Sequence, residues 1–220
     1  MKMHESLGKA GAIAALAASL LAAGCGSLPD KPTRATLYDF GPGPVSAAPA
    51  DRPAGAAALQ PIALADIEAN ARLDGTQMLY RLGYADANEV RPYGQSRWSQ
   101  SPAQLLRQRL REALAATRPV LGPEESATIA RTEGRVPDTL RVTLEEFSQF
   151  FDAPASSVGL IRVHATLIRT SPGGDRVLAQ RSFSARRAAP SHDAPGGVKA
   201  LADASDALVA ELVAWANQPR

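Results

Sequence analysis

Residues 159–187 read GLIRVHATLIRTSPGGDRVLAQRSFSARR, and this stretch decides the fold. Apolar and polar residues alternate along residues 159–169, which predicts a strand with one buried face. Pro172-Gly173-Gly174 then predicts a hairpin turn, and residues 176–187 predict the returning strand with Phe183 pointing inward. The residues expected on the buried face of the first strand are Ile161, Val163, Ala165 and Leu167.

The segment before this hairpin shows the same alternation. Residues 139–144 predict another strand, and the phase of the alternation breaks at Glu145-Glu146, which predicts a β-bulge. Low-complexity residues 41–60 are expected to form a loop. Further extended segments are expected at residues 36–40, 61–67, 76–83 and 88–98, the last of them broken by Pro92 and Gly94.

Two helices are expected. Ser101, Pro102 and Gln104 form the pattern of a capping serine, a proline at the first helical position and a glutamine three residues after the cap. The apolar stripe of this first helix comprises Leu106, Leu110, Ala113 and Leu114, with Leu105 beside it. Arg107, Arg109 and Arg111 are expected on its solvated face. A second helix is expected at residues 198–217, with a stripe of Leu201, Ser205, Leu208, Leu212 and Trp215.

The order of these elements predicts the fold class. Strands, a helix, three more strands and a final helix indicate an α+β fold, in which two amphipathic helices pack on one face of a mainly antiparallel sheet. Residues 36–220 are long enough to form a single domain with its own core.

The first residues of the chain have the pattern of a secretory signal. Lys2 and Lys9 precede an apolar run at residues 11–23, which is shorter than the roughly 20 residues that a bilayer-spanning helix needs. Residues 1–24 are therefore expected to be a signal peptide that is cleaved from the mature protein.

Cys25 is the only cysteine of the chain and directly follows this signal. Residues 21–25, LAAGC, resemble the lipobox of bacterial lipoproteins, although Ala22 stands where the usual lipobox has leucine. The resemblance implies cleavage before Cys25, lipidation of its thiol, and a flexible tether over residues 25–35. In the enterobacterial sorting pattern, Gly26 favours the outer membrane. The alternative is an ordinary secretory signal with an incidental Cys25.

Composition and motifs exclude several functions. Loss of Lys2, Lys9 and Glu5 with the signal leaves 22 basic and 21 acidic residues, a balance that argues against nucleic acid as a partner. A single cysteine excludes a CxxC motif and a cysteine-based zinc site. Ser191-His192-Asp193 contains the residue types of a hydrolase triad, but adjacent residues do not adopt triad geometry. The sequence therefore predicts a protein that is not an enzyme and uses no cofactor or metal.

Residues 77–114 carry the main family resemblance. Tyr80-Arg81 at the end of a predicted strand, then Tyr93 and Trp98, and Pro102 opening a helix resemble the ABC-type transport auxiliary lipoprotein family, which includes paraquat-inducible protein C-like lipoproteins. The resemblance implies a partnership with an MCE-domain protein, a permease and an ATPase that together move lipids between two membranes. It also implies a position on the outer membrane and makes homo-oligomers plausible.

Tyr80, Arg81, Tyr93 and Trp98 are the candidate partner interface, because exposed aromatic and arginine side chains are typical interface anchors. The alternative is that the aromatic residues simply pack in the core beneath the first helix. Two other functions remain open: a stand-alone outer-membrane lipoprotein that binds a ligand or regulates cell-envelope synthesis, and a hydrolase that uses His192.

Overall fold

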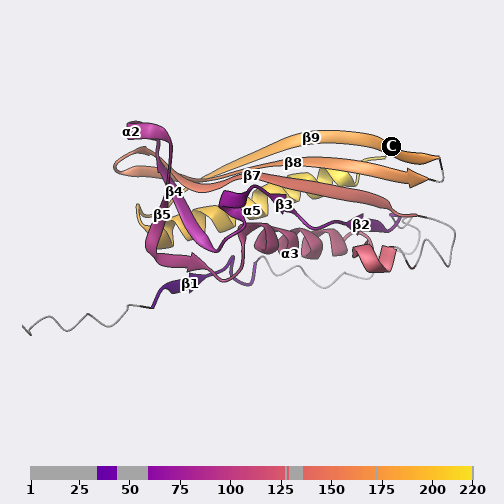
Figure 1. Ribbon diagram of the computed structural model, residues 1–220, viewed down its shortest axis with the longest axis horizontal. Helices are drawn as coiled ribbons and strands as arrows, with labels where there is room; N and C mark the ends of the chain where they lie inside the picture. The colour runs from indigo at the N-terminus through magenta and orange to yellow at the C-terminus, as the bar shows by residue number, and fades with distance from the viewer. Residues whose placement is uncertain (1–33, 44–58, 127, 129–135, 172, 220) are drawn as a thin grey trace, which may run out of the picture. The chain divides into compact units, whose positions relative to one another are not determined.

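Three long antiparallel strands form the centre of the computed structural model (Figure 1). They are β7 (Asp138–Ala153), β8 (Ser156–Ser171) and β9 (Gly174–Ala188), and the hairpin expected over residues 159–187 is confirmed. The structure describes residues 34–43, 59–126, 128, 136–171 and 173–219, of which residues from 35 onward belong to one unit. The predicted signal peptide, Cys25, and most of the tether and of the 41–60 loop lie outside the described residues.

The predicted bulge is confirmed within β7. The pairing of β7 with β8 shifts between Leu144 and Glu146, at the acidic doublet of the sequence. Because an extra residue moves every later side chain to the opposite face, Phe147 continues the buried face that Leu144 belongs to. The bulge also turns Glu146 onto the other face of the sheet, where it is nevertheless buried.

The second edge of β7 is filled by three short strands. These are β2 (Ile62–Leu64), β3 (Glu68–Ala69) and β4 (Gln77–Leu82), and all three pair with β7 in parallel. The α+β class is confirmed, but the sheet is mixed and not clearly mainly antiparallel as predicted: among the described residues, five of the eight strand pairings are parallel and three, including the two longest, are antiparallel. The reason is the long crossover between β4 and β7, which lets the chain return in the same direction.

β5 (Ala87–Trp98) pairs antiparallel with β4 and continues through Pro92 and Gly94, where a break was expected. On its other side, β1 (Thr36–Tyr38) pairs only with Ser96–Trp98. At Pro92, β5 is therefore paired by β4 alone, and the missing N–H of a proline is tolerated on such an edge. The remaining elements are β6 (Val120–Leu121), the 3-10 turn η1 (Ala71–Leu73) and the single helical turn α2 (Gly83–Asp86).

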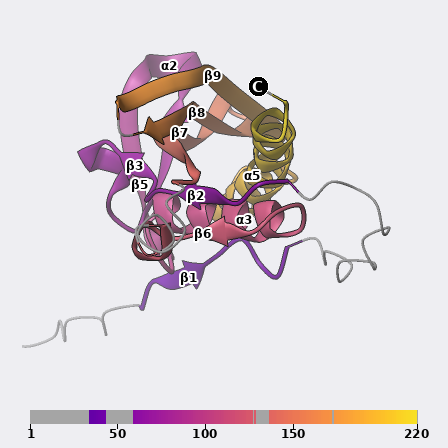
Figure 2. The same cartoon turned by 90° about the vertical axis from the view of Figure 1, so that its right-hand side faces the viewer.

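Both long helices lie on the same side of β7–β9 (Figure 2). α3 (Pro102–Ala115) begins with the predicted capping box, in which Ser101 and Gln104 bond to each other's backbone N–H. α5 (Ala194–Ala216) begins four residues before its expected start, because Asp193 accepts a hydrogen bond from the Gly196 N–H and caps the helix.

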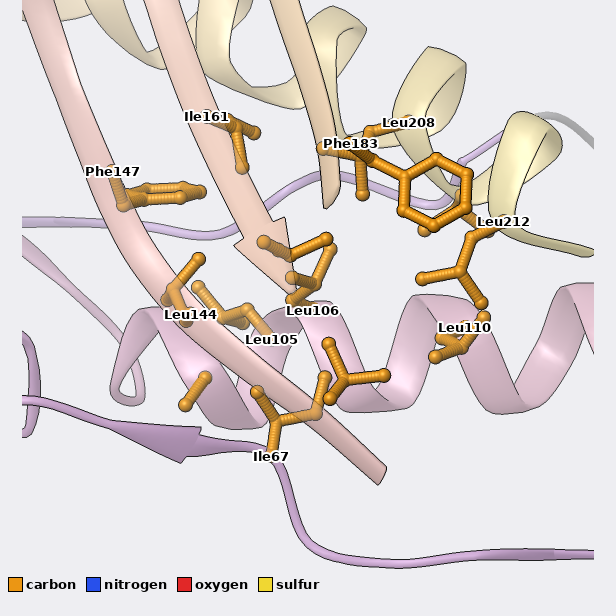
Figure 3. Close-up of a cluster of buried hydrophobic side chains, with 14 of the residues drawn as sticks. Ile67, Leu105, Leu106, Leu110, Leu144, Phe147, Ile161, Phe183, Leu208 and Leu212 are labelled. Carbon is orange, nitrogen blue, oxygen red and sulfur yellow. The ribbon is translucent and has the colours of Figure 1, made fainter. Parts of the chain in front are cut away.

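The core lies between these helices and the sheet (Figure 3). Its strand residues include Leu144, Phe147, Ile161 and Phe183, and its helix residues include Leu105, Leu106, Leu110, Leu208 and Leu212. α5 lies so close to β8 that a Cβ on Gly159 would come within 2.5 Å of the Ala200 carbonyl carbon. Only glycine permits this approach, so Gly159 fixes the depth at which α5 packs.

Candidate functional site

The four candidate interface residues lie on two neighbouring strands but occupy different environments. Tyr80 and Arg81 belong to β4, and Tyr93 and Trp98 belong to β5, which is the antiparallel neighbour of β4. The structure brings Tyr80 and Tyr93 into contact, whereas Trp98 lies at the other end of the β4–β5 pairing, where its N–H donates to the Thr76 carbonyl. Their burial then separates them into a core residue, a pair of half-buried aromatics and an arginine held in an ion pair.

Trp98 is a core residue. Only 1% of it is exposed, and its ring lies edge-on against Phe40 at 5.8 Å and Phe147 at 5.5 Å between ring centroids. A side chain enclosed in this way offers no surface to another protein. Trp98 therefore packs in the core, as the alternative prediction had it, and is not part of a partner interface.

Tyr80 and Tyr93 are half-buried and pack against each other, with their ring centroids 4.7 Å apart and the ring planes tilted by 43°. The Tyr93 hydroxyl donates a hydrogen bond to Gln149 Oε1 at 2.7 Å, and Gln149 Nε2 donates to Ser157 Oγ at 2.9 Å. Burial raises the pKa of Tyr93 to about 12, with the nearby Tyr80 and Asp193 adding to the effect. Tyr93 therefore stays protonated at neutral pH and holds the buried Gln149 amide in place.

Arg81 binds a buried carboxylate at the bulge of β7. Its Nη2 lies 3.0 Å from Glu146 Oε2, and its Nη1 donates to the carbonyl oxygens of Ala87 and Asn88. Arg72 also reaches Glu146 Oε2, at 3.4 Å. Because the side chains of Arg81 and Glu146 are 12% and 6% exposed, Arg81 neutralises a charge that the fold has enclosed.

A second buried arginine was missed by the sequence analysis. Arg109 was expected on the solvated face of its helix, but it is 7% exposed and donates to the carbonyl oxygens of Phe40 and Gly41 at 3.0 and 3.1 Å. It also lies 3.4 Å from Asp206 on α5. Burial raises the pKa of Asp206, and the charge of Arg109 acts in the opposite direction. The signal for this burial was its position three residues after Leu106, on the edge of the apolar stripe.

Arg109 holds Phe40 and Gly41, which follow β1 near the start of the described unit. Residues 37–43 border an open hollow of about 530 Å3, whose other wall is formed by α5. The wall is mixed in character: Leu37, which is 67% exposed, Val198 and Ala202 lie beside Lys199 and Asp203. These residues form a mildly apolar surface next to the start of the domain.

The Ser191-His192-Asp193 segment forms the cap of α5. The Ser191 hydroxyl donates to Asp193 Oδ1 at 2.5 Å, and the Gly196 N–H donates to the same oxygen at 2.9 Å. Both bonds lower the pKa of Asp193. Serine thus bonds to the aspartate itself, an arrangement that caps a helix and differs from the serine–histidine–aspartate order of a hydrolase.

Within the described ranges, no group of three or more histidine, cysteine, aspartate or glutamate residues could hold a metal ion. In the same part of the chain, no helix is both long and apolar enough to cross a membrane.

Several solved structures share this fold. Protein XCC0632 from Xanthomonas campestris is 19% identical, with 72% of this chain and 85% of that chain covered and a TM-score of 0.62. An uncharacterised protein is 15% identical, with 83% of this chain and 99% of that chain covered and a TM-score of 0.56. The hypothetical protein CT253 from Chlamydia trachomatis is 10% identical, with 73% of this chain and 96% of that chain covered and a TM-score of 0.50. At these identities the likeness concerns the fold alone.

No curated protein matches the sequence. The family model described as ABC-type transport auxiliary lipoprotein component, however, matches residues 44–213. The matched range includes all three central strands, the whole of α3 and most of α5, and the family is not one of enzymes. The chain therefore belongs to the ABC-type transport auxiliary lipoprotein family.

Proposed function

We propose that this protein is a lipid-anchored, non-catalytic auxiliary subunit of an MCE-type ABC transport system that moves lipids or other hydrophobic molecules between the inner and outer membranes. The observation that carries the proposal is the family match over residues 44–213. The anchor would be the lipidated Cys25 in the outer membrane, with the domain facing the periplasm.

The division of labour follows from the motifs of the sequence. The chain contains no GxxxxGK[ST] phosphate loop, so the energy of ATP hydrolysis would come from the ATPase subunit of the same system. The task left to this chain is to bind an MCE-domain protein and to hold it near the membrane that the lipid anchor occupies.

The surface proposed for the partner is the half-buried pair Tyr80 and Tyr93. Their outer parts remain accessible, while the contact between the two rings restrains both and the hydrogen bond to Gln149 holds Tyr93. Rigid aromatic side chains are effective interface anchors because little side-chain entropy is lost on binding. Arg81 would contribute by supporting this surface from below through Glu146.

The test is co-purification of the full-length lipidated chain with the MCE-domain protein of the same organism. We expect a complex that Tyr80→Ala weakens and that the ring-preserving control Tyr80→Phe retains. A wild-type chain that never captures an MCE-domain protein would favour the stand-alone lipoprotein over the transport role.

The anchor has its own test. Cys25→Ser is expected to move the protein from the membrane fraction to the soluble periplasmic fraction, because acyl chains supply the attachment. A serine variant that still fractionates with membranes would contradict the proposed anchor. Assembly of several copies, which the family resemblance makes plausible, is measured by light scattering on the purified full chain.

A further inference from the structure

The free edge of β9 is the most extensive unused backbone surface in the described part of the chain. We propose that this edge binds an extended acidic segment of another protein, which joins the sheet as an additional strand. The inference does not rest on the transport role, because it follows from the pairing and the charge of β9 alone.

β9 is paired on one side only. Over its 15 residues it pairs with β8, and no other described strand lies beside it (Figure 1). α5 packs against the inner face of β9, with the rings of Trp215 and Phe183 5.6 Å apart. A long, uncovered edge is a ready template for strand addition, and most of the residues along this one are exposed.

The hydrogen-bond pattern identifies which backbone groups are available. The Ala189 N–H bonds to the Ser157 carbonyl at 2.9 Å, which fixes the alternation of the antiparallel ladder. Phe183 and Ala185 therefore bond to β8, whereas the N–H and C=O groups of Ser182, Ser184 and Arg186 point toward the open edge. The register shift between Leu167 and Ile168 makes the far end of β9 less regular, so the usable stretch begins after it.

The charge of β9 selects the chemistry of the partner. The strand carries Arg176, Arg181, Arg186 and Arg187 against a single acidic residue, Asp175. Arg186 is paired with Asp152 at 3.2 Å, and Arg181 lies 4.9 Å from the centre of the Phe183 ring. Because side chains alternate along a strand, Arg181 and Arg187 lie on the same face as Phe183 and Arg186 lies on the opposite face. Glutamate or aspartate side chains on an added strand would lie beside these exposed guanidinium groups.

A second copy of the chain fits the edge poorly. If two β9 strands paired antiparallel over this usable stretch, about Ser184, the Arg181 of each copy would face the Arg187 of the other. Like charges directly opposite each other destabilise a strand pair. The same arginines that attract an acidic strand therefore repel another β9.

The test uses a labelled, end-blocked peptide in which valine alternates with glutamate, together with the same peptide carrying lysine in place of glutamate. Binding to the full-length protein in detergent is measured by fluorescence anisotropy at low and high salt. We expect the glutamate peptide to bind at least about tenfold more tightly than the lysine peptide, and added salt to weaken it.

Two variants locate the binding. Ser184→Pro removes an N–H that points away from β8 and is expected to abolish binding, while the matched control Ser184→Thr keeps that N–H and the affinity. If circular dichroism shows that Ser184→Pro is unfolded, the double variant Arg181→Glu/Arg187→Glu tests instead whether β9 binds the peptide. This variant should bind the lysine peptide more tightly than the glutamate peptide. Unchanged affinity in a folded Ser184→Pro protein, equal affinity for both peptides, or a dimer that Ser184→Pro dissociates would each overturn the proposal.

Discussion

The two edges of the β7–β9 strands differ in how they are used. The β7 edge is filled by β2, β3 and β4, which pair with it one after another from Asp138 to Phe151. The β9 edge carries no described strand at all. One edge thus completes the fold of this chain, and the other leaves its backbone groups available to a different one.

This contrast shows why residue type alone does not identify an interface. Aromatic and arginine residues occur at both edges, but Arg81 and Trp98 on the filled side are held by Glu146 and by the core. The arginines of β9 are exposed instead. Pairing partners distant in the sequence decide which of these side chains reach solvent.

The largest expected effect is at Trp98. Trp98→Ala should lower the free energy of unfolding by about 4 kcal/mol, because it removes a large ring from a packed core. Urea denaturation of the wild type, Trp98→Ala and Trp98→Phe measures this, with a smaller loss for phenylalanine. If Trp98→Ala left the free energy of unfolding unchanged and abolished binding of the partner protein, Trp98 would belong to the interface after all.

Arg81→Ala comes next, with an expected loss of about 3 kcal/mol, since Glu146 would keep a buried charge with only Arg72 as its partner. A double-mutant cycle with Glu146→Gln measures the coupling. We expect the second substitution to cost much less in the Arg81→Ala background than in the wild type. Strict additivity would show that the two residues do not interact.

Tyr93→Phe should cost about 1–2 kcal/mol, because it leaves the buried Gln149 amide oxygen without its donor. Thermal unfolding measures the loss. Tyr80→Phe is the control, because no hydrogen bond from its hydroxyl supports Gln149 in the described residues. Equal losses in both variants would contradict the role given to the Tyr93 hydroxyl.

Proline substitutions at two neighbouring positions of β9 compare the cost of losing an N–H at the open edge with the cost of losing one that bonds to β8. Ser184→Pro should change the free energy of unfolding by less than about 1 kcal/mol, because its N–H faces the open edge. Ala185→Pro should cost several times more, because the Ala185 N–H bonds to β8. Equal costs would mean that the Ser184 N–H also has a partner.

The smallest effect is expected at the cap of α5. Because the folded state lowers the pKa of Asp193 below its ordinary 3.8, this group stabilises the fold above that pH and loses its contribution as the pH falls. Asp193→Asn keeps a capping side chain and should flatten the acid limb of a stability–pH profile. An unchanged acid limb would exclude Asp193 as its source.

Local sequence features predicted part of this structure. The alternation over residues 159–187, the Glu145-Glu146 bulge and the capping box at Ser101 each act through neighbouring residues, and all three are confirmed. The start of α5 was missed because Pro195-Gly196-Gly197 has poor helix propensity, while the cap at Asp193 offsets it.

Features set by long-range contacts were not predictable in this way. Whether β2–β4 run parallel to β7 depends on the crossover, and the burial of Arg109 depends on carbonyl groups 68 and 69 residues away. At the candidate site, the sequence named Tyr80 and Tyr93 but could not predict that their rings meet, nor separate them from the enclosed Trp98.

Hydrogen exchange along β9 tests the contrast between the two edges most directly. We predict alternation: slow exchange at the amides of Phe183 and Ala185, which bond to β8, and fast exchange at Ser182, Ser184 and Arg186, whose N–H groups face the open edge. Uniformly slow exchange from Ser182 to Arg186 in the isolated protein would contradict the account, because it would mean that this edge is already covered.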